Sequence, residues 1–435
     1  MLYEEARVYL DSVSKYGSVL GLDSIKNLLE ELGNPQKELT FIHIAGTNGK
    51  GSILAYLSTI LTEAGYRTGR YISPTVIGYL ERFQIDGAFM EKEELAQLTC
   101  QVKEAAERLV EAGKPSPTVF EIETAMAFLY FKESGCDFVV LESGLGGLMD
   151  ATNVIENPKL CVFASVSMDH IGVLGNTLEE IARDKAGIIK SGSEVVTGRQ
   201  QPCVKEVLEE TARAKGCRIT IAEPEEIQVL EQSLEVQKFS YGEFETMEIH
   251  LAGQHQIENA VTVLEAVRAL RRQGVRIEEE AVRKGLERTK WPGRLMVLGS
   301  RPLVIADGAH NEDAVRRLAE NLDIYLKGKK VTAVLGVFKD KEYEKMIGIM
   351  TPYLDYVYAI DLPNRDRTLA KEELCEVLAK YGICAEQAVH IEQALVQAKK
   401  TSGKRWCGTC IWFLILSWRS DPFGRTCGKE VEDGR

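Results

Sequence analysis

A glycine-rich segment carrying one lysine follows a short apolar run near the start of the chain. Residues 39–44 have the composition of a buried strand, and residues 53–61 repeat apolar side chains at helical spacing. A glycine-rich turn between a strand and a helix N-terminus points backbone N–H groups at an anion, and a lysine adds positive charge. We therefore expect nucleotide phosphate to bind the turn formed by Gly46, Thr47, Asn48, Gly49, Lys50, Gly51 and Ser52.

This turn departs from the ordinary Walker pattern, which places Ser or Thr directly after the Gly-Lys pair. Here Gly51 comes between Lys50 and Ser52. The alternative interpretation is a glycine-rich turn that binds no ligand. A lysine between two glycines gains little from packing, which favours the phosphate-binding interpretation.

Polar side chains also follow two later apolar runs. Glu142 ends the run 138–141, and the carboxyl end of a buried parallel strand is where α/β proteins bind ligands. A carboxylate there suits a hard cation such as Mg²⁺. Asp169 and His170 end a further strand-like run in the same way. The structural alternatives are a solvated strand-end glutamate and a histidine that satisfies its hydrogen bonds within the protein.

Composition limits the class of protein. The chain has 435 residues, of which 45% are hydrophobic and 27% charged, and this length predicts two or three domains. A net charge of −12 argues against a general nucleic-acid-binding protein, which needs a basic face. The first residues lack a secretory signal, and no apolar run approaches the roughly 20 residues that cross a bilayer. We therefore expect a cytoplasmic protein without a membrane segment.

The ten cysteines are scattered along the chain. A chain of this size does not need disulfides for stability, so we expect buried free thiols. Residues 407–410 have CxxC spacing, but no second pair or nearby histidine accompanies them. This isolated pair does not predict a metal or redox site.

Strand-like and helical patterns alternate along most of the chain. Residues 138–141, 160–164 and 331–336 read as buried strands, and residues 91–112 and 259–273 as amphipathic helices. This alternation predicts an α/β fold with mostly parallel sheets covered on both faces. Stricter alternation over residues 218–252 predicts a small antiparallel addition.

A change of pattern at residues 290–294, where Pro and Gly interrupt the helical spacing, indicates a domain boundary. We expect a P-loop ATPase-like domain with a central, mostly parallel sheet over residues 1–293. A smaller Rossmann-like α/β domain is expected over residues 294–435, starting with one strand at 297–307. A nucleotide bound by the first domain and covered by the second would lie in a cleft between them.

These motifs, taken in order, resemble the Mur-ligase superfamily, and in particular the folylpolyglutamate synthase and dihydrofolate synthase family. The resemblance covers roughly residues 16–395. It rests on the phosphate loop and on further segments of the same family pattern, which are 73–74 with 81–83, 117–121, 142–153, 169–175, 184–188, 253–259 and 307–311.

The resemblance implies two Mg²⁺ ions. In the family pattern the metal ligands fall on Ser73, Glu142, His170 and Lys185, and the lysine is carbamylated by CO₂. Lys50, His170 and Lys185 would then be the catalytic residues. The structural alternative for Lys185 is an ordinary exposed lysine near a helix end. Asp184 stands where the family has glutamate, which conserves the charge.

The resemblance also implies ATP and folate contacts. Asn259 would meet the adenine, Asp307 would suit a ribose hydroxyl, and Arg294 and His310 would reach the phosphates. The pterin pocket would be shaped by Phe120, Asp150 and Ala151, and Phe120 as an ordinary core residue is the alternative. Thr75, Ser143, Leu148 and Met149 depart from the family residues on this side.

The predicted function is that of an ATP-dependent amide ligase that adds L-glutamate to a folate-type carboxylate through an acyl phosphate. The expected substrates are ATP, L-glutamate and folate or dihydropteroate, and the expected state is a monomer. A cell-wall Mur ligase is a first alternative, but the phosphate loop begins too early in the chain for the separate N-terminal domain that those enzymes carry. The second alternative is a catalytically silent nucleotide-binding protein.

The last part of the sequence has a different character. Three of the four tryptophans and three of the ten cysteines follow residue 404, where the family would continue with an apolar strand and a glycine-rich turn. We interpret this as a frameshift near residue 404. Residues 410–416 remain apolar enough to form a strand at a weakened sheet edge, with Trp412 and Trp418 exposed. Residues 420–435 are expected to be disordered.

Overall fold

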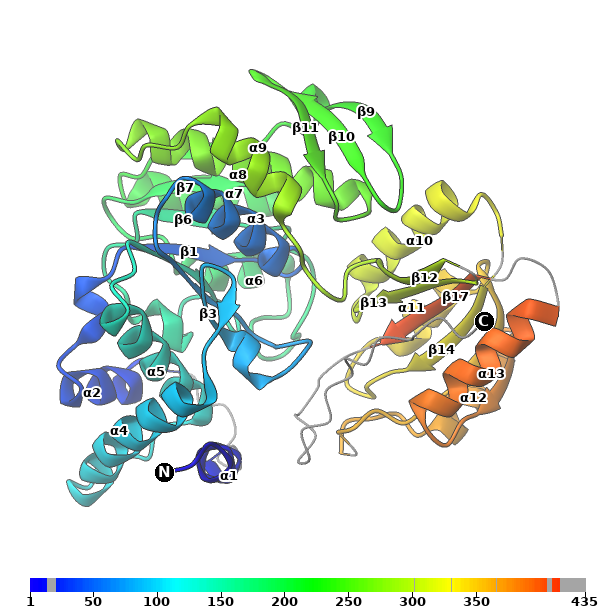
Figure 1. Ribbon diagram of the computed structural model, residues 1–435, viewed down its shortest axis with the longest axis horizontal. Coiled ribbons are helices and arrows are strands. Elements are labelled where there is room, and N and C mark those ends of the chain that lie inside the picture. The colour runs from blue at the N-terminus through cyan, green and yellow to red at the C-terminus, as the bar shows by residue number, and fades with distance from the viewer. Residues whose placement is uncertain (14–20, 301, 330, 365, 405–408, 415–435) are drawn as a thin grey trace, which may run out of the picture.

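The computed structural model describes residues 1–13, 21–300, 302–329, 331–364, 366–404 and 409–414, with the backbone alone from residue 399 onward (Figure 1). Its largest sheet has eight strands in the order β4-β3-β2-β5-β1-β6-β7-β8. All neighbours pair in parallel except β2 with β3 and β3 with β4. The strands are β1 Phe41–Ala45, β2 Thr68–Tyr71, β3 Phe83–Ile85, β4 Ala88–Phe89, β5 Phe138–Glu142, β6 Leu160–Phe163, β7 Glu194–Thr197 and β8 Ile219–Ile221.

The central strands of this sheet are buried on both faces, which explains why their sequences are apolar apart from His43 in β1 and Glu142 at the end of β5. Ile42 and Ile44 of β1 pack with helices on one face, whereas Phe41 packs with helices on the other. The first set is α3 Lys50–Glu63, α8 Gln254–Arg272 and α9 Glu279–Arg288; the second is α1 Tyr3–Val13, α2 Asp23–Glu31, α4 Lys92–Glu111 and α5 Val119–Glu133.

Two more helices, α6 Leu178–Ala186 and α7 Pro202–Ala214, pack against the β6–β7 part of the sheet. Short 3₁₀ turns occupy η2 Pro35–Glu38, η3 Tyr79–Arg82, η4 Ala151–Val154 and η5 Pro224–Glu226. None of the helices in the described residues is long and apolar enough to cross a membrane.

A three-stranded antiparallel sheet follows the large one, with β9 Gln228–Gln232, β10 Gln237–Tyr241 and β11 Phe244–Ile249 in the order β11-β10-β9. The predicted antiparallel addition is therefore present. Its predicted start was wrong, because Ile219–Ile221 joins the large sheet as β8. Helix α8 begins at Gln254, earlier than the apolar spacing alone indicated, because the polar residues 254–256 form its first turn.

The third sheet has six strands in the order β12-β13-β17-β14-β15-β16. Figure 1 shows this sheet beside the large one, with the chain passing between them after α9. The strands are β12 Met296–Ser300, β13 Leu303–Asp307, β14 Val331–Gly336, β15 Leu354–Ala359, β16 Cys384–Gln387 and β17 Thr409–Leu414. The helices are α10 Glu312–Leu326, α11 Tyr343–Met350, α12 Lys371–Lys380 and α13 Ile391–Lys404.

Two expectations about this sheet were wrong. Residues 297–307 form two antiparallel strands rather than one, because the chain reverses between Ser300 and Leu303. The late strand β17 does not lie at an edge but in the middle of the sheet, in parallel register with β13 and β14. The side chains of residues 412 and 418 and the whole of 420–435 lie outside the described residues.

The predicted α/β class with mostly parallel sheets is confirmed. The cysteines that the structure describes are free, as predicted, but most of them are not buried. Cys136 and Cys161 are buried, whereas Cys384 is exposed on β16.

Candidate active site

The glycine-rich loop joins β1 to α3 and is held against the end of β6. The Thr47 backbone N–H donates to the Ser165 carbonyl at 2.7 Å, and the Thr47 hydroxyl donates to the Ser167 carbonyl at 3.0 Å. Gly49 has φ of +93°, and a Cβ there would lie 2.7 Å from Asn259 Oδ1 of α8. Glycine at this position therefore allows both the left-handed turn and the approach of α8.

Two lysines and one glutamate converge on this loop. Lys50 Nζ donates to the Thr47 carbonyl at 3.2 Å and lies 3.8 Å from Glu142 Oε1 at the end of β5. Lys185 Nζ, from α6, donates to the Gly46 carbonyl at 2.9 Å. Glu142 and Lys185 are 6% and 4% exposed, so both groups are removed from water.

Burial shifts both of these groups towards neutrality. It raises the pKa of Glu142 to about 6, with partial opposition from Lys50. It lowers the pKa of Lys185 to about 7, and the charge of Lys50 lowers that pKa further. A cation beside Glu142 would restore its charge, and a neutral Lys185 amine is a nucleophile.

The residues predicted to hold Mg²⁺ present donor atoms of the kind that this cation prefers. Ser73 Oγ is buried and has no hydrogen-bond partner within the described part of the chain, and Ser73 lines the same cleft as Glu142 and Lys185. His170 also lines this cleft; it has φ of +50°, and its backbone N–H donates to Asp169 Oδ1 at 2.8 Å. Burial lowers the pKa of the His170 ring, and Asp169 partly opposes the shift. These donors fit a cation site.

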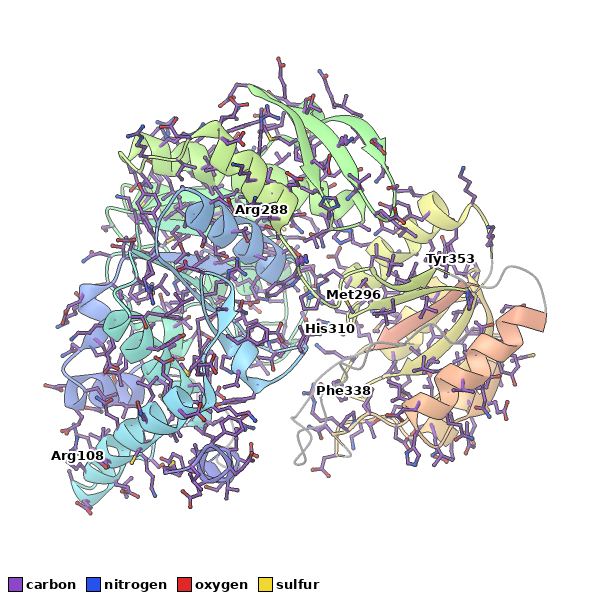
Figure 2. All side chains as sticks on the ribbon, in the orientation of Figure 1. Arg108, Arg288, Met296, His310, Phe338 and Tyr353 are labelled. Atoms are coloured by element: carbon purple, nitrogen blue, oxygen red, sulfur yellow. The ribbon has the colours of Figure 1, made fainter. Side chains whose placement is uncertain are left out.

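The cleft lies between the large sheet and the six-stranded sheet. From the first it receives the glycine-rich loop and the metal-ligand candidates, and from the second Met296, Asp307 and His310. Figure 2 shows Met296 and His310 on the side of the six-stranded sheet that faces the large one. The connecting segment, residues 289–295 between α9 and β12, contributes Trp291 to the cleft. Trp291 lies over Gly51, where a Cβ would overlap the indole ring.

A second pocket adjoins the loop and reaches α8 and α10. Asn259, Arg294, Asp307 and His310 all line it, together with Asn48. The four residues predicted to contact ATP outside the glycine-rich loop are thus brought together, although Asn259 precedes Asp307 by 48 residues in the chain.

Asp307 and His310 are constrained within this pocket. Asp307 accepts the Leu295 and Ala309 backbone N–H groups at 2.9 and 2.8 Å. His310 Nδ1 donates to the Gly308 carbonyl at 2.8 Å, and burial lowers the pKa of the ring to about 4. The neutral ring therefore offers Nε2 as an acceptor, and donation to a phosphate requires its protonation.

Two bridges between the sheets were not found by sequence analysis. Asn48 of the glycine-rich loop donates to Asp313 Oδ2 at 2.8 Å and exchanges hydrogen bonds with Asn311. Lys341 Nζ donates to Asp169 Oδ1 at 2.7 Å. Their positions in the sequence could have indicated these residues, because Asn311 and Asp313 follow β13 and Lys341 follows β14, at the carboxyl ends of parallel strands.

The three residues assigned to folate lie behind the cleft rather than among its lining residues. A Cβ on Gly144 would lie 2.5 Å from Phe120 Cζ, so this ring packs beneath the loop that follows β5. Asp150 and Ala151 are 3% and 6% exposed. Asp150 accepts the Leu145 backbone N–H at 2.7 Å, and Leu145 itself lines the cleft.

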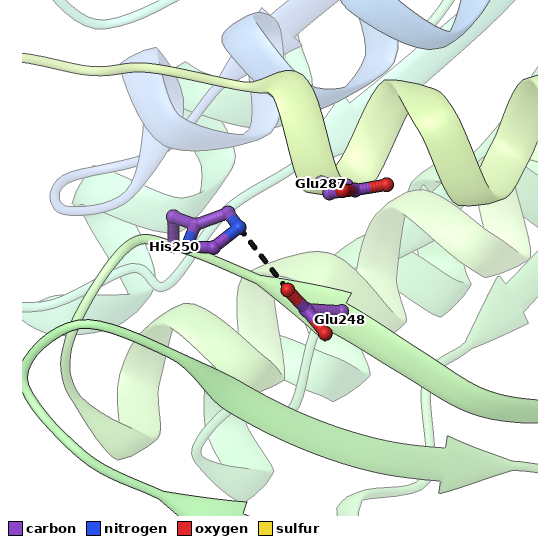
Figure 3. Close-up of side chains that lie close together, drawn as sticks. All are labelled: Glu248, His250 and Glu287. Carbon is purple, nitrogen blue, oxygen red and sulfur yellow. Dashed lines mark ion pairs between the residues drawn. The ribbon is translucent and has the colours of Figure 1, made fainter.

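Figure 3 shows a separate group of possible metal ligands, Glu248, His250 and Glu287. His250 Nε2 lies 3.2 Å from Glu248 Oε1, and Nδ1 donates to the Glu235 carbonyl at 2.9 Å. Glu248 also pairs with Lys238 at 3.6 Å. This group lies between β11 and α9, outside the cleft, and Lys238 already compensates the charge of Glu248.

Comparison with known proteins identifies the family of this chain. A family model described as the Mur ligase middle domain matches residues 44–267, and one described as the Mur ligase glutamate ligase domain matches residues 293–405. A dihydrofolate synthase/folylpolyglutamate synthase from Bacillus subtilis is 39% identical over 79% of this chain and 82% of its own length. The chain belongs to this family of Mur ligases.

Solved structures of this Mur ligase family share this fold over most of the chain. A Mycobacterium tuberculosis folylpolyglutamate synthase complexed with ADP has a TM-score of 0.85, with 29% identity over 94% of this chain and 95% of its own. An FPGS–AMPPCP–folate complex has a TM-score of 0.78, with 29% identity over 92% of this chain and 100% of its own. The second family match ends at residue 405, close to the residue where the sequence changes character.

Proposed function

We propose that this chain is an ATP-dependent ligase that joins L-glutamate to a folate-type carboxylate. The observation that carries the proposal is the convergence of Lys50, Glu142 and Lys185 on the glycine-rich loop, opposite His310 across one cleft. This arrangement suits a triphosphate held between two sheets. The names of the relatives, which include folylpolyglutamate and dihydrofolate synthases, support the choice of substrates.

ATP is needed because a carboxylate oxygen is a poor leaving group. The acceptor carboxylate attacks the γ-phosphorus in line, the bond from that phosphorus to the ADP oxygen breaks, and an acyl phosphate forms. The amino group of glutamate then attacks the acyl carbon, and loss of inorganic phosphate and a proton leaves the amide. Lys50 and Arg294 supply positive charge for the phosphates during the first step.

The residues Ser73, Glu142 and His170 would hold Mg²⁺ at two sites, with Lys185 joining them as a carbamate. When bound, these ions neutralise charge on the triphosphate oxygens. Carbamylation converts the neutral Lys185 amine and CO₂ into an anionic ligand with release of one proton. The support on this chain is the orphaned Ser73 hydroxyl, the burial of Glu142 and the shifted pKa of Lys185.

The ATP site in this proposal has two parts. The phosphates would lie on the loop formed by Gly46, Thr47, Asn48, Gly49, Lys50, Gly51 and Ser52, and Arg294 and His310, which line both the cleft and the adjoining pocket, would reach them. Asn259 and Asp307 in the adjoining pocket would meet the adenine and a ribose hydroxyl. Phe120, Asp150 and Ala151 shape the acceptor side from behind the loop after β5. Residues 1–293 would form the ATP-binding domain and 294–435 the ligase domain, in a monomeric, cytoplasmic enzyme.

Phosphate release decides between this proposal and its alternatives. The chain is incubated with ATP and either tetrahydrofolate or dihydropteroate, each with and without L-glutamate. Release that requires an acceptor and rises with glutamate supports the ligase. Tetrahydrofolate stimulation supports folylpolyglutamate synthesis, which we favour, and dihydropteroate stimulation supports dihydrofolate synthase activity. ATP binding without stimulation by either acceptor supports the silent nucleotide-binding protein and contradicts the proposal.

A further inference from the structure

His43 is a polar residue in the middle of the apolar strand β1. It is fully buried, and its neighbours Ile42 and Ile44 face the opposite side of the sheet. A buried imidazole without hydrogen bonds would be costly, so its partners decide what it does. Of its two nitrogens, Nε2 is bonded, and Nδ1 has no hydrogen-bond partner among the residues that the structure describes.

The bonded nitrogen begins a chain of buried hydrogen bonds. His43 Nε2 lies 2.9 Å from the Thr152 hydroxyl in η4. The Thr152 hydroxyl in turn donates to Asp150 Oδ1, and the Thr152 backbone N–H reaches the same oxygen at 3.0 Å. The other carboxylate oxygen, Asp150 Oδ2, accepts the Leu145 backbone N–H at 2.7 Å. This series of hydrogen bonds therefore connects β1 to the loop after β5.

The direction of each bond follows from the chemistry of its ends. An ionised carboxylate only accepts, so the single Thr152 hydrogen points to Asp150. The hydroxyl oxygen then accepts from His43, which places the ring proton on Nε2 and leaves Nδ1 as the unpartnered lone pair. Burial lowers the pKa of His43 to about 3, and Lys190 lowers it further, so the ring is neutral as this pattern requires.

The loop after β5, where this series of hydrogen bonds ends, is part of the cleft. Ser143, Gly144 and Leu145 line it directly after Glu142, and Gly144 rests on the Phe120 ring. The conformation of this loop sets the shape of the wall that the acceptor would contact. Removing the Thr152 hydroxyl leaves Asp150 with one donor fewer, and removing His43 leaves that hydroxyl without the donor that orients it, so either change gives the loop more freedom.

We propose that His43 and Thr152 are positioning residues that orient Asp150 and, through it, the Ser143–Leu145 wall for the folate-type acceptor. This inference rests on the proposed function. It assigns a role to a histidine that neither the phosphate loop nor the metal-ligand candidates include.

The test compares Thr152→Val with Thr152→Ser. Valine keeps the shape of threonine but removes the hydroxyl that links His43 to Asp150, whereas serine keeps it. We expect Thr152→Val to raise the KM for tetrahydrofolate about tenfold, which corresponds to about 1.4 kcal/mol, with the KM for ATP unchanged. Thr152→Ser should leave the KM for tetrahydrofolate close to that of the wild type. His43→Gln, whose amide can still donate to Thr152, retains more acceptor affinity than His43→Leu.

A buried hydroxyl elsewhere serves as the control for stability. Thr99 of α4 is buried, and among the described residues its hydroxyl bonds to its own helix and to Met126, far from the cleft lining. Thr99→Val should therefore lower the melting temperature and leave both KM values unchanged. If Thr152→Val behaves like Thr99→Val, with a lower melting temperature and unchanged KM values, the inference is wrong. A wild-type chain that releases no phosphate with either acceptor contradicts the proposed function instead.

Discussion

Lys341 and Asp169 form an ion pair of 2.7 Å between the six-stranded sheet and the large sheet, and each side chain is only 11% exposed. Asp169 precedes the metal-ligand candidate His170, and Lys341 follows β14. The pair therefore lies beside the cleft and joins its two walls. Despite desolvation, the Lys341 ammonium and its hydrogen bond hold the pKa of Asp169 well below its usual range.

Because this ion pair joins the two walls of the cleft, we expect its removal to let the walls separate. Lys341→Met leaves a partly buried carboxylate without its cation, which favours separation of the two walls. We expect trypsin to cut the connecting segment at Lys290 or Arg294 several-fold faster than in the wild type. Lys345→Met is the control, because Lys345 pairs on the surface with Glu342 and is 60% exposed. Equal cleavage of Lys341→Met and wild type would contradict the prediction.

Lys185 predicts dependence on CO₂. Its pKa of about 7 means that the neutral amine, which is the form that reacts with CO₂, becomes dominant as pH rises through that value. Enzyme stripped of CO₂ should regain activity on addition of CO₂, and faster above pH 7 than below it. Lys185→Ala should lose most activity and regain part of it with acetate.

Lys205→Ala is the matched control for Lys185, since Lys205 pairs with Glu209 on the surface of α7. It should keep the activity and CO₂ response of the wild type. Full activity in Lys185→Ala would rule out the carbamate.

We expect the ionised Glu142 carboxylate to be needed for activity and, at the same time, to destabilise the folded chain. The unfolded carboxyl loses its proton near 4.5 and the folded one near 6, so ionisation destabilises the folded chain as pH rises between these values. This loss is about 2 kcal/mol. Glutamine cannot ionise, so Glu142→Gln should gain about 2 kcal/mol of unfolding free energy relative to wild type over that interval, and should lose ligase activity.

Urea unfolding without nucleotide or divalent cation, at pH values below 4.5 and above 6, measures this difference. Any effect of the substitution on the free energy of unfolding that does not depend on pH cancels, because the comparison is between two pH values. A stability difference that does not change with pH would show that Glu142 is not destabilised in the folded chain.

Strand β17 predicts that the end of the chain is needed for folding even though its sequence is atypical. It pairs with both β13 and β14, so removal of residues 405–435 would leave two strands with unpaired edges. We expect the chain ending at residue 404 to aggregate, and the chain ending at residue 414 to behave as the full chain in size-exclusion chromatography. A monodisperse 1–404 chain would contradict this.

The frameshift interpretation is tested separately, by resequencing the gene through codons 395–435. A reading frame shifted near residue 404 should restore the apolar strand and glycine-rich turn of the family pattern. An unshifted frame would show that the atypical residues are native.

Much of the site could be predicted because its signals are local. The glycines of residues 46–51 mark a turn that needs left-handed φ values and close approach of other segments, and Glu142 directly ends a strand of continuous apolar residues. Both features depend on neighbours in the chain. The alternation of strands and helices likewise determined the α/β class, since burial on both faces requires continuous apolar strands.

Other features were decided by tertiary structure alone. Lys341 and Asp169 are 172 residues apart, and His43 reads as an interruption of an apolar strand until Thr152 lies beside it. The position of β17 between β13 and β14 is equally invisible, because strand order in a parallel sheet is set by crossover connections. The pKa values of Glu142 and Lys185 depend on loss of water and on distances to charges from distant segments, and these exist only once the chain has folded.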